Sequence, residues 1–103
     1  MRDAGGLLLR ALLREAGGEG AVRCLAIRSI AWASATFTGA RHELTLLLHG
    51  EDAEARASAI GAGIASMEFM LPGHLVADAA FVGRRATAAG VEVDLEALTV
   101  EEA

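Results

Sequence analysis

The stretch that decides the fold is VEVDLEA, residues 91–97, in which apolar residues occupy every odd position and acidic residues every even one. Successive side chains of a strand point to opposite faces, so this alternation predicts a strand with one buried face and one wet, acidic face. We expect the strand to continue to about Val100.

The segment before this strand predicts its hairpin partner. Residues 71–73, Leu-Pro-Gly, are typical of a turn, and residues 74–84 then read as a strand. One face of this strand would carry Leu75, Ala77, Ala79 and Phe81, and the other Val76, Asp78, Ala80 and Val82. Residues 85–90 are expected to form the turn that reverses the chain direction. A hairpin over about 74–100 follows from this pattern.

A second hairpin is expected over about 21–49. Leu44, Leu46 and Leu48 alternate with Glu43, Thr45 and Leu47 after a turn at residues 38–41. The long segment 21–37 reads as its partner, divided into two strands or bulged at residues 28–29. A helix over residues 27–35 competes with this interpretation, because alanine does not favour strands.

Two helices are expected, one before each hairpin. Residues 3–16 carry a leucine stripe at helical spacing, and residues 17–20, Gly-Gly-Glu-Gly, end it. Residues 51–67 repeat apolar side chains at +4, +3, +4 and +3, after an acidic pair that suits a helix start. Gly61 and Gly63 would let this helix lie close to a sheet.

The predicted order is α-β-β-α-β-β, a single α+β domain over residues 1–103 with a largely antiparallel or mixed sheet of four to five strands and two helices packed on it. Apolar residues make up 53% of the chain and charged residues 22%, which excludes a disordered chain. No stretch is long enough to span a membrane, and the N-terminus lacks the apolar core of a signal peptide. We therefore expect a cytoplasmic protein.

The charge is divided unevenly along the chain. The net charge is −5, which does not suit a protein that holds nucleic acid. Residues 1–50 contain six arginines and four acidic residues, whereas residues 51–103 contain three arginines and ten acidic residues. Oppositely charged edges would let copies dock head to tail, although an acidic solubilising surface is the simpler alternative.

No pattern for catalysis, cofactor binding or metal binding is present. His42, His49 and His74 have no spacing typical of a metal site, and the single cysteine, Cys24, excludes an internal disulfide. Cys24 lies in an apolar stretch and is expected to be a buried structural thiol. The prediction is a non-enzyme without cofactor; a small enzyme using His42, His49 or Cys24 is a lesser alternative.

Several stretches carry a resemblance to a known family. They are Gly39–Leu46, GARHELTL, at a strand entry; Met70–Val76, MLPGHLV, at a turn; Phe81; the pair Arg84-Arg85; and the last strand, Val91–Val100. In this order, around an alanine-rich helix, residues 38–102 resemble the small tail-terminator or tail-completion proteins of long-tailed phages. The likeness is greatest to those of prophages and gene transfer agents of alphaproteobacteria.

The resemblance implies a structural function in the neck of a phage-like particle. Six copies would form a ring on the head-proximal end of the tail tube, stop its polymerisation and join it to the head–tail connector or stopper protein. DNA would pass through the ring, with no membrane involved. Such a protein would be cytoplasmic during assembly and part of the particle afterwards.

Two groups of residues are candidates for this function. The candidate lumen-facing residues are Glu92, Asp94 and Glu96, because an acidic lumen does not retain DNA. The candidate interface residues with other copies or partners are charged or sit at strand ends: Arg28, Arg41, Glu43, His49, Arg84 and Arg85. Another phage-type neck or tail protein, or a small dimeric α+β binding or regulatory domain, remains an alternative function.

Overall fold

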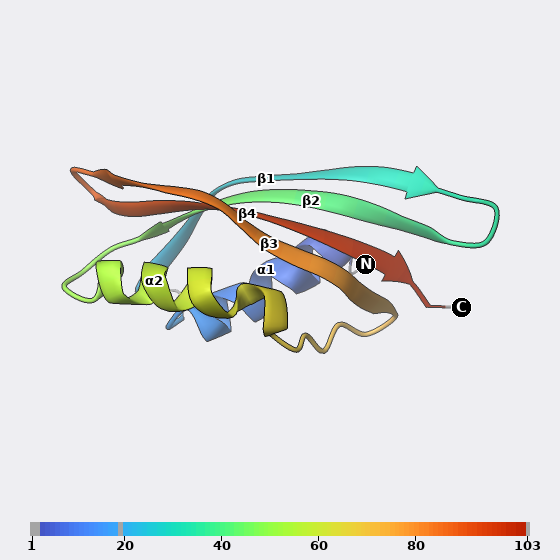
Figure 1. Cartoon of the computed structure of the whole chain (residues 1–103), viewed down its shortest axis with the longest axis horizontal. Coiled ribbons are helices and arrows are strands. Elements are labelled where there is room, and N and C mark those ends of the chain that lie inside the picture. Colours follow the sequence, from blue (N-terminus) through green and yellow to red (C-terminus); the bar gives the residue numbers. More distant parts are fainter. Residues whose placement is uncertain (1–2, 19, 103) are drawn as a thin grey trace.

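The computed structural model describes residues 3–18 and 20–102, which form two α-helices and one four-stranded sheet in the order α-β-β-α-β-β (Figure 1). The predicted α+β class and element order are confirmed, with four strands rather than five. The helices are α1, Ala4–Glu15, and α2, Ala53–Gly63, which continues into one 3₁₀ turn, Ile64–Ser66. The strands are β1, Val22–Ala33; β2, Thr38–Leu48; β3, His74–Thr87; and β4, Gly90–Glu101.

The sheet has the order β1-β2-β4-β3, and every neighbouring pair is antiparallel. The two hairpins of the sequence therefore lie side by side as the two halves of the sheet. Both helices lie on one side of it (Figure 1), so the described residues leave its other side, hereafter the bare face, without a covering layer.

The core lies between the helices and the inner face of the two central strands. The alternation predicted for residues 91–97 is present, because the odd positions are buried and the even positions are only half-buried. Leu46, Leu48 and Leu95 are among the largest fully buried side chains, and Leu8 of α1 packs with them. Burial of these leucines, at about 1.5–3 kcal/mol each, is the main stabilising contribution.

The first hairpin differs from the expectation in two details. Strand β1 ends at Ala33 and the reversal lies at residues 34–37, so the turn predicted at residues 38–41 is wrong, because those residues pair with β1 and β4 as part of β2. The interruption falls at Leu25, where the pairing with β2 shifts between Cys24 and Ala26, and not at residues 28–29. The competing helix over residues 27–35 is wrong. Pairing with the strongly alternating β2 outweighs the weak strand preference of the alanines in this segment.

Strand β3 is longer than the sequence indicates. It runs to Thr87 and not only to Arg84, so Arg85 lies within the strand and not in the reversal. The reversal is confined to Ala88 and Ala89. Gly90, which follows, has φ 146° and approaches the carbonyl of Leu48 so closely that a Cβ would lie 2.1 Å from its oxygen.

Helix α2 also departs from the expectation at both ends. Asp52 occupies the N-cap position, so the acidic pair does lie at the helix start, but its side chain makes no capping hydrogen bond. The helix ends at Gly63 and not at Met67. Gly61 does lie against β3 as expected, since a Cβ there would contact the ring of Phe81 at 3.6 Å.

Candidate functional site

The bare face collects most of the charged residues that the sequence singled out. Odd positions of β2 and even positions of β4 point to this face, because the even positions of β2 and the odd positions of β4 fill the core. The register therefore places on it all three candidate lumen residues and four of the six candidate interface residues, listed together as Arg28, Arg41, Glu43, Arg85, Glu92, Asp94 and Glu96.

Ion pairs cross the bare face from strand to strand. Arg85 lies 2.7 Å from Glu92 and 2.7 Å from Asp94. The Thr45 hydroxyl donates to the second carboxylate oxygen of Asp94 at 2.7 Å. On the β1 side, Arg28 pairs with Glu43 at 3.3 Å. Hydrogen bonds from Arg85, and then from Thr45, hold the pKa of Asp94 below its ordinary value of 3.8.

This arrangement changes the electrostatic character of the candidate lumen residues. Arg85 compensates part of the charge of Glu92 and Asp94, whereas Glu96 has no ion-pair partner among the described residues. A shallow cavity of about 390 Å³ lies between Arg28, Glu43, Val82 and Glu96. The bare face is therefore weakly acidic rather than strongly acidic.

Two candidate interface residues lie elsewhere. Arg84 points to the helix side of β3, where it binds Glu54 and, at 3.2 Å, the Ser58 hydroxyl of α2. His49 follows β2 at the opposite end of the hairpin from its turn, and its carbonyl accepts from Arg56 at 2.9 Å. The six candidate residues therefore do not form one contiguous interface.

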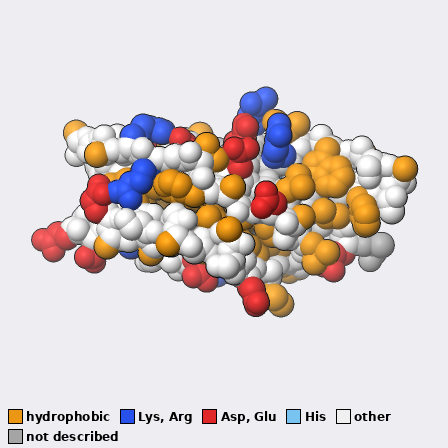
Figure 2. Space-filling view, viewed as in Figure 1, with side chains coloured by type: hydrophobic (Ala, Val, Ile, Leu, Met, Phe, Trp, Pro, Cys, Tyr) orange, Lys and Arg blue, Asp and Glu red, His pale blue; other side chains and the backbone are white. Residues whose placement is uncertain are grey.

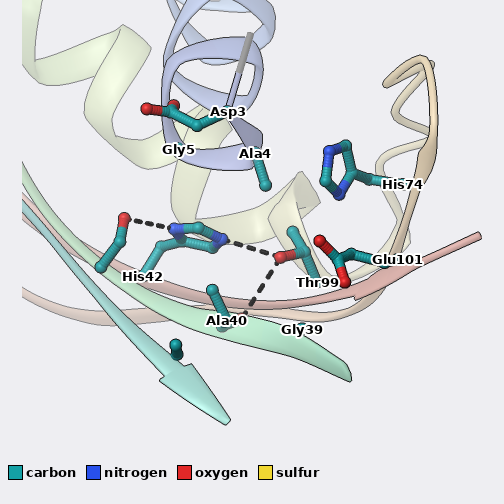
Figure 3. A pocket seen from close by; sticks show the side chains of 11 residues that line it. Asp3, Ala4, Gly5, Gly39, Ala40, His42, His74, Thr99 and Glu101 are labelled. Atoms are coloured by element: carbon teal, nitrogen blue, oxygen red, sulfur yellow. Dashed lines mark hydrogen bonds between the residues drawn. The ribbon is translucent and has the colours of Figure 1, made fainter. Parts of the chain in front are cut away.

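A second polar cluster, which the sequence did not predict, surrounds His42 on the inner face (Figure 3). His42 is 1% exposed. Its Nδ1 lies 2.7 Å from the Ser29 hydroxyl of β1, and its Nε2 lies 2.8 Å from the Thr99 hydroxyl of β4. Thr99 in turn donates to the carbonyl of Ala40 at 3.3 Å.

These partners assign the protons of the ring. The single proton of the Thr99 hydroxyl is donated to Ala40, so Thr99 accepts from Nε2–H of His42. Nδ1 is then unprotonated and accepts from the hydroxyl of Ser29. The neutral imidazole thus joins three strands of the sheet through satisfied hydrogen bonds.

A cavity of about 390 Å³ adjoins this cluster at the N-terminus of α1. Asp3 caps the helix by accepting from the backbone N–H of Gly6 at 2.7 Å, so the helix end already has its negative partner. His74 also lines the cavity (Figure 3), and its Nδ1 is buried without a partner in the described chain. Residues 3–18 and 20–102 contain no cluster of His, Cys, Asp or Glu suited to a metal ion.

We expect the buried His42 to make stability depend on pH. Burial, the largest cause, holds the pKa of His42 below its ordinary value of 6.5. The unfolded chain therefore binds a proton that the folded protein resists. The full stability is present above about pH 6.5 and decreases as the pH falls below that value.

The measurement is urea unfolding of the His42→Gln variant between about pH 8 and pH 5. Near pH 8 the variant should be less stable by about 1–3 kcal/mol, because Ser29 and Thr99 lose a partner. Its stability should also lose the pH dependence of the parent in this range. His49→Gln is the control and should retain that dependence; a parent with equal stability at both pH values would contradict the assignment.

Cys24 is not as fully buried as expected. Its side chain is half-buried, packs against the core, and donates to the carbonyl of Ala26 at 3.5 Å. Burial raises the pKa of the thiol, which keeps it protonated. This environment fits the structural role that the sequence indicated.

The comparisons with protein-family models, curated proteins and solved structures find no match to the chain. Among the described residues, no helix is both long and apolar enough to cross a membrane. What the structure defines is the class: an α+β domain with a four-stranded antiparallel sheet and one bare, charged face.

Proposed function

We propose that the chain is a structural, non-enzymatic subunit of a phage-like particle, of the tail-terminator type. Six copies form a ring at the head-proximal end of the tail tube and join it to the head connector. DNA passes through the ring. The proposal is based on the resemblance of residues 38–102 to tail-terminator proteins. Its structural support is the distribution of charged side chains that have no ion-pair partner.

The carrying observation is that the internal ion pairs leave opposite charges on the two halves of the sheet. Among the described residues, Arg28, Arg84 and Arg85 have carboxylate partners. The arginines without one are Arg10 and Arg14 on α1, Arg23 on β1, Arg41 on β2 and Arg56 on α2. Four of these five belong to the half formed by α1, β1 and β2.

Uncompensated carboxylates gather in the other half. Exposed examples are Glu51 and Asp52 before α2, Glu68 after the 3₁₀ turn, and Asp78 on β3. A head-to-tail ring needs two different and complementary surfaces on each copy. The arginine side of one copy and the carboxylate side of the next meet this requirement, and such charges also accelerate association.

The bare face supplies the second line of support. Glu92, Asp94 and Glu96 all point to it. Arg23 and Arg41 also point to this face, so its charge is nearly balanced and it offers no net positive charge to hold the phosphate backbone of DNA. If this face lines the ring, the two helices lie on the outside.

The experiment is native mass spectrometry of the purified protein over a wide concentration range at low salt. A closed hexamer is the expected result. A tight dimer that never grows would overturn the ring and favour the small dimeric binding domain. Addition of a phage-type tail-tube protein then distinguishes a terminator, which should cap the tube, from another neck protein.

Charge reversal directly tests whether opposite charges on neighbouring copies drive association. We expect Arg10→Glu/Arg14→Glu to weaken association about tenfold per interface at low salt, with a smaller effect as salt rises. Arg10→Lys/Arg14→Lys keeps the charge and is the matched control. Reversal at Arg84 and Arg85 is less suitable, because these side chains hold Glu54, Glu92 and Asp94 within their own chain. Equal association of the reversed and control variants would contradict the charge argument.

One observation favours an enzyme as the second candidate function. The Ser29 hydroxyl donates to the neutral His42, the contact that activates a serine nucleophile for acyl transfer. The Nε2–H of His42 faces Thr99 and not a carboxylate, so no negative group stabilises the imidazolium that the reaction would form. Covalent labelling by a fluorophosphonate, lost in Ser29→Ala and kept in Ser58→Ala, would establish this alternative; its absence supports the structural role.

A further inference from the structure

We infer that copies of this chain join edge to edge, with β1 of one copy continuing the sheet alongside β3 of the next. The inference rests on the proposed ring and specifies its contact. Strands β1 and β3 are the two edges of the sheet and contain 12 and 14 residues. No other strand of the described chain pairs with their outer sides. Long free edges are the natural place for strand addition.

The exposed apolar side chains lie on the same two edge strands. The large hydrophobic residues that remain exposed include Leu25 (44%) and Ile27 (41%) on β1, and Leu75 (56%) and Val82 (55%) on β3. None lies on the central strands β2 or β4. Figure 2 shows hydrophobic side chains gathered on one side of the arginines near the centre of the view.

The direction of the strands suits a closed ring. All neighbours in the β1-β2-β4-β3 sheet are antiparallel, so β1 and β3 run in opposite directions. When copies are related by rotation about an axis along the strands, β3 of one copy meets β1 of the next as an antiparallel pair. The antiparallel hydrogen bonding of the sheet therefore continues from one copy to the next. The bare faces of all copies then lie on the same side of the continuous sheet.

The strand register shows which residues of neighbouring copies would meet. One row of paired residues runs through Ile27, Leu44, Leu95 and Phe81. Unstaggered copies thus bring the exposed Ile27 level with Phe81 of the neighbouring copy, which extends the core across the boundary. The residues displaced by bulges, Leu25 on β1 and Val82 on β3, lie close to this level on the two edges.

The charges agree with this pairing. The row of Arg28 contains Glu43, Glu96 and Ala80. Asp78 lies two residues from Ala80 along β3, so it would come within diagonal reach of Arg28 of the neighbouring copy. Around the edges, the arginines of α1 would face the carboxylates that precede and follow α2, which is the complementarity described above.

The diameter of a ring built in this way also suits the passage of DNA. Strands lie about 4.8 Å apart, so six four-stranded sheets with strands along the axis would close on a circle about 37 Å across. Any tilt of the strands widens this circle. The interior would admit a DNA duplex after side chains are subtracted, with the helices outside.

Cysteine cross-linking tests the contact. In a Cys24→Ala background, Ala26→Cys on β1 is combined in turn with Asp78→Cys, Ala80→Cys or Gly83→Cys on β3. These positions share the bare face and sample three registers. Residues 26 and 83 lie in one row but on opposite edges of the four-stranded sheet, too far apart for a disulfide within one chain. Every disulfide formed is therefore between copies.

The expected result for at least one pair is a ladder of covalent species that ends at six chains after mild oxidation. The matched control combines Ala26→Cys with Ala62→Cys on the exposed side of α2 and should give no ladder. Hydrogen exchange adds a readout that needs no substitution: backbone amides of β1 and β3 should gain protection on assembly, while β2 and β4 do not change.

The outcomes separate this inference from the proposed function. A hexamer in native mass spectrometry without any ladder or edge protection would overturn edge pairing and leave the ring standing. A ladder that runs past six chains would support edge pairing and overturn the hexameric ring. A ladder that stops at two chains would overturn edge pairing, because a pair joined through β1 and β3 still has one free edge of each kind. A chain that stays monomeric at every concentration, with no cross-linking, would overturn edge pairing.

Discussion

Replacing Gly39 by alanine is expected to lower the free energy of unfolding by about 2–4 kcal/mol. A Cβ on Gly39 would lie 2.0 Å from the carbonyl oxygen of Thr99 and 2.8 Å from the ring of Trp32. The first obstacle is backbone of β4 and cannot rotate away. The hairpin and the last strand would have to separate at this row.

Chemical unfolding followed by circular dichroism measures this effect. Gly83→Ala is the matched control, because it also lies in a strand and its Cβ would meet no atom within 4 Å. That variant should be unchanged or more stable by up to about 1 kcal/mol. Equal stability of the two variants would show that β2 and β4 are not packed as described.

Replacing Leu46 by alanine is expected to cost about 2–5 kcal/mol, a large share of the 5–15 kcal/mol available to a domain of this size. Leu46 is 0% exposed and lies on a central strand beneath both helices. Its removal leaves a cavity that the surrounding leucines cannot fill without moving the sheet.

Met70→Ala provides the control for this loss. Met70 is a residue of similar size that is 88% exposed in the loop before β3, so its truncation should change stability by less than about 0.5 kcal/mol. Thermal unfolding of the two variants at low protein concentration measures the difference without interference from assembly. A Leu46→Ala variant as stable as Met70→Ala would contradict the assigned core.

The ring and its proposed contact have one consequence for these measurements. If copies join through β1 and β3, the exposed Ile27 and Val82 stabilise the assembly and not the isolated chain. Their truncation should therefore leave unfolding at low concentration nearly unchanged and weaken association. Core residues such as Leu46 should behave in the opposite way.

Much of the fold followed from local pattern. The alternation at residues 91–97 and at Leu44, Leu46 and Leu48 marked the two central strands correctly, because these strands are buried on one face only. The edges were less well predicted. The bulge at Leu25 and the extension of β3 through Arg85 depend on pairing with neighbouring strands, which no local window contains.

The candidate site was predicted in part. Glu92, Asp94 and Glu96 were correctly placed on a wet face, but Arg85, the partner of Glu92 and Asp94, was assigned to a turn. The buried His42 cluster was missed, because Ser29 and Thr99 join it from 13 and 57 residues away. Only the register of the finished hairpins brings such residues together, and no spacing along the chain signals it.

The sequence by itself determined the order of the elements, the α+β class and the division of charge between the halves, because periodicity and composition are properties of neighbouring residues. The tertiary structure alone decided which charges remain uncompensated and which strands become edges. Ion pairs such as Arg85 with Asp94, and the strand order β1-β2-β4-β3, arise from contacts across the sheet. Those contacts depend on strand pairing and on how the helices cover a single face.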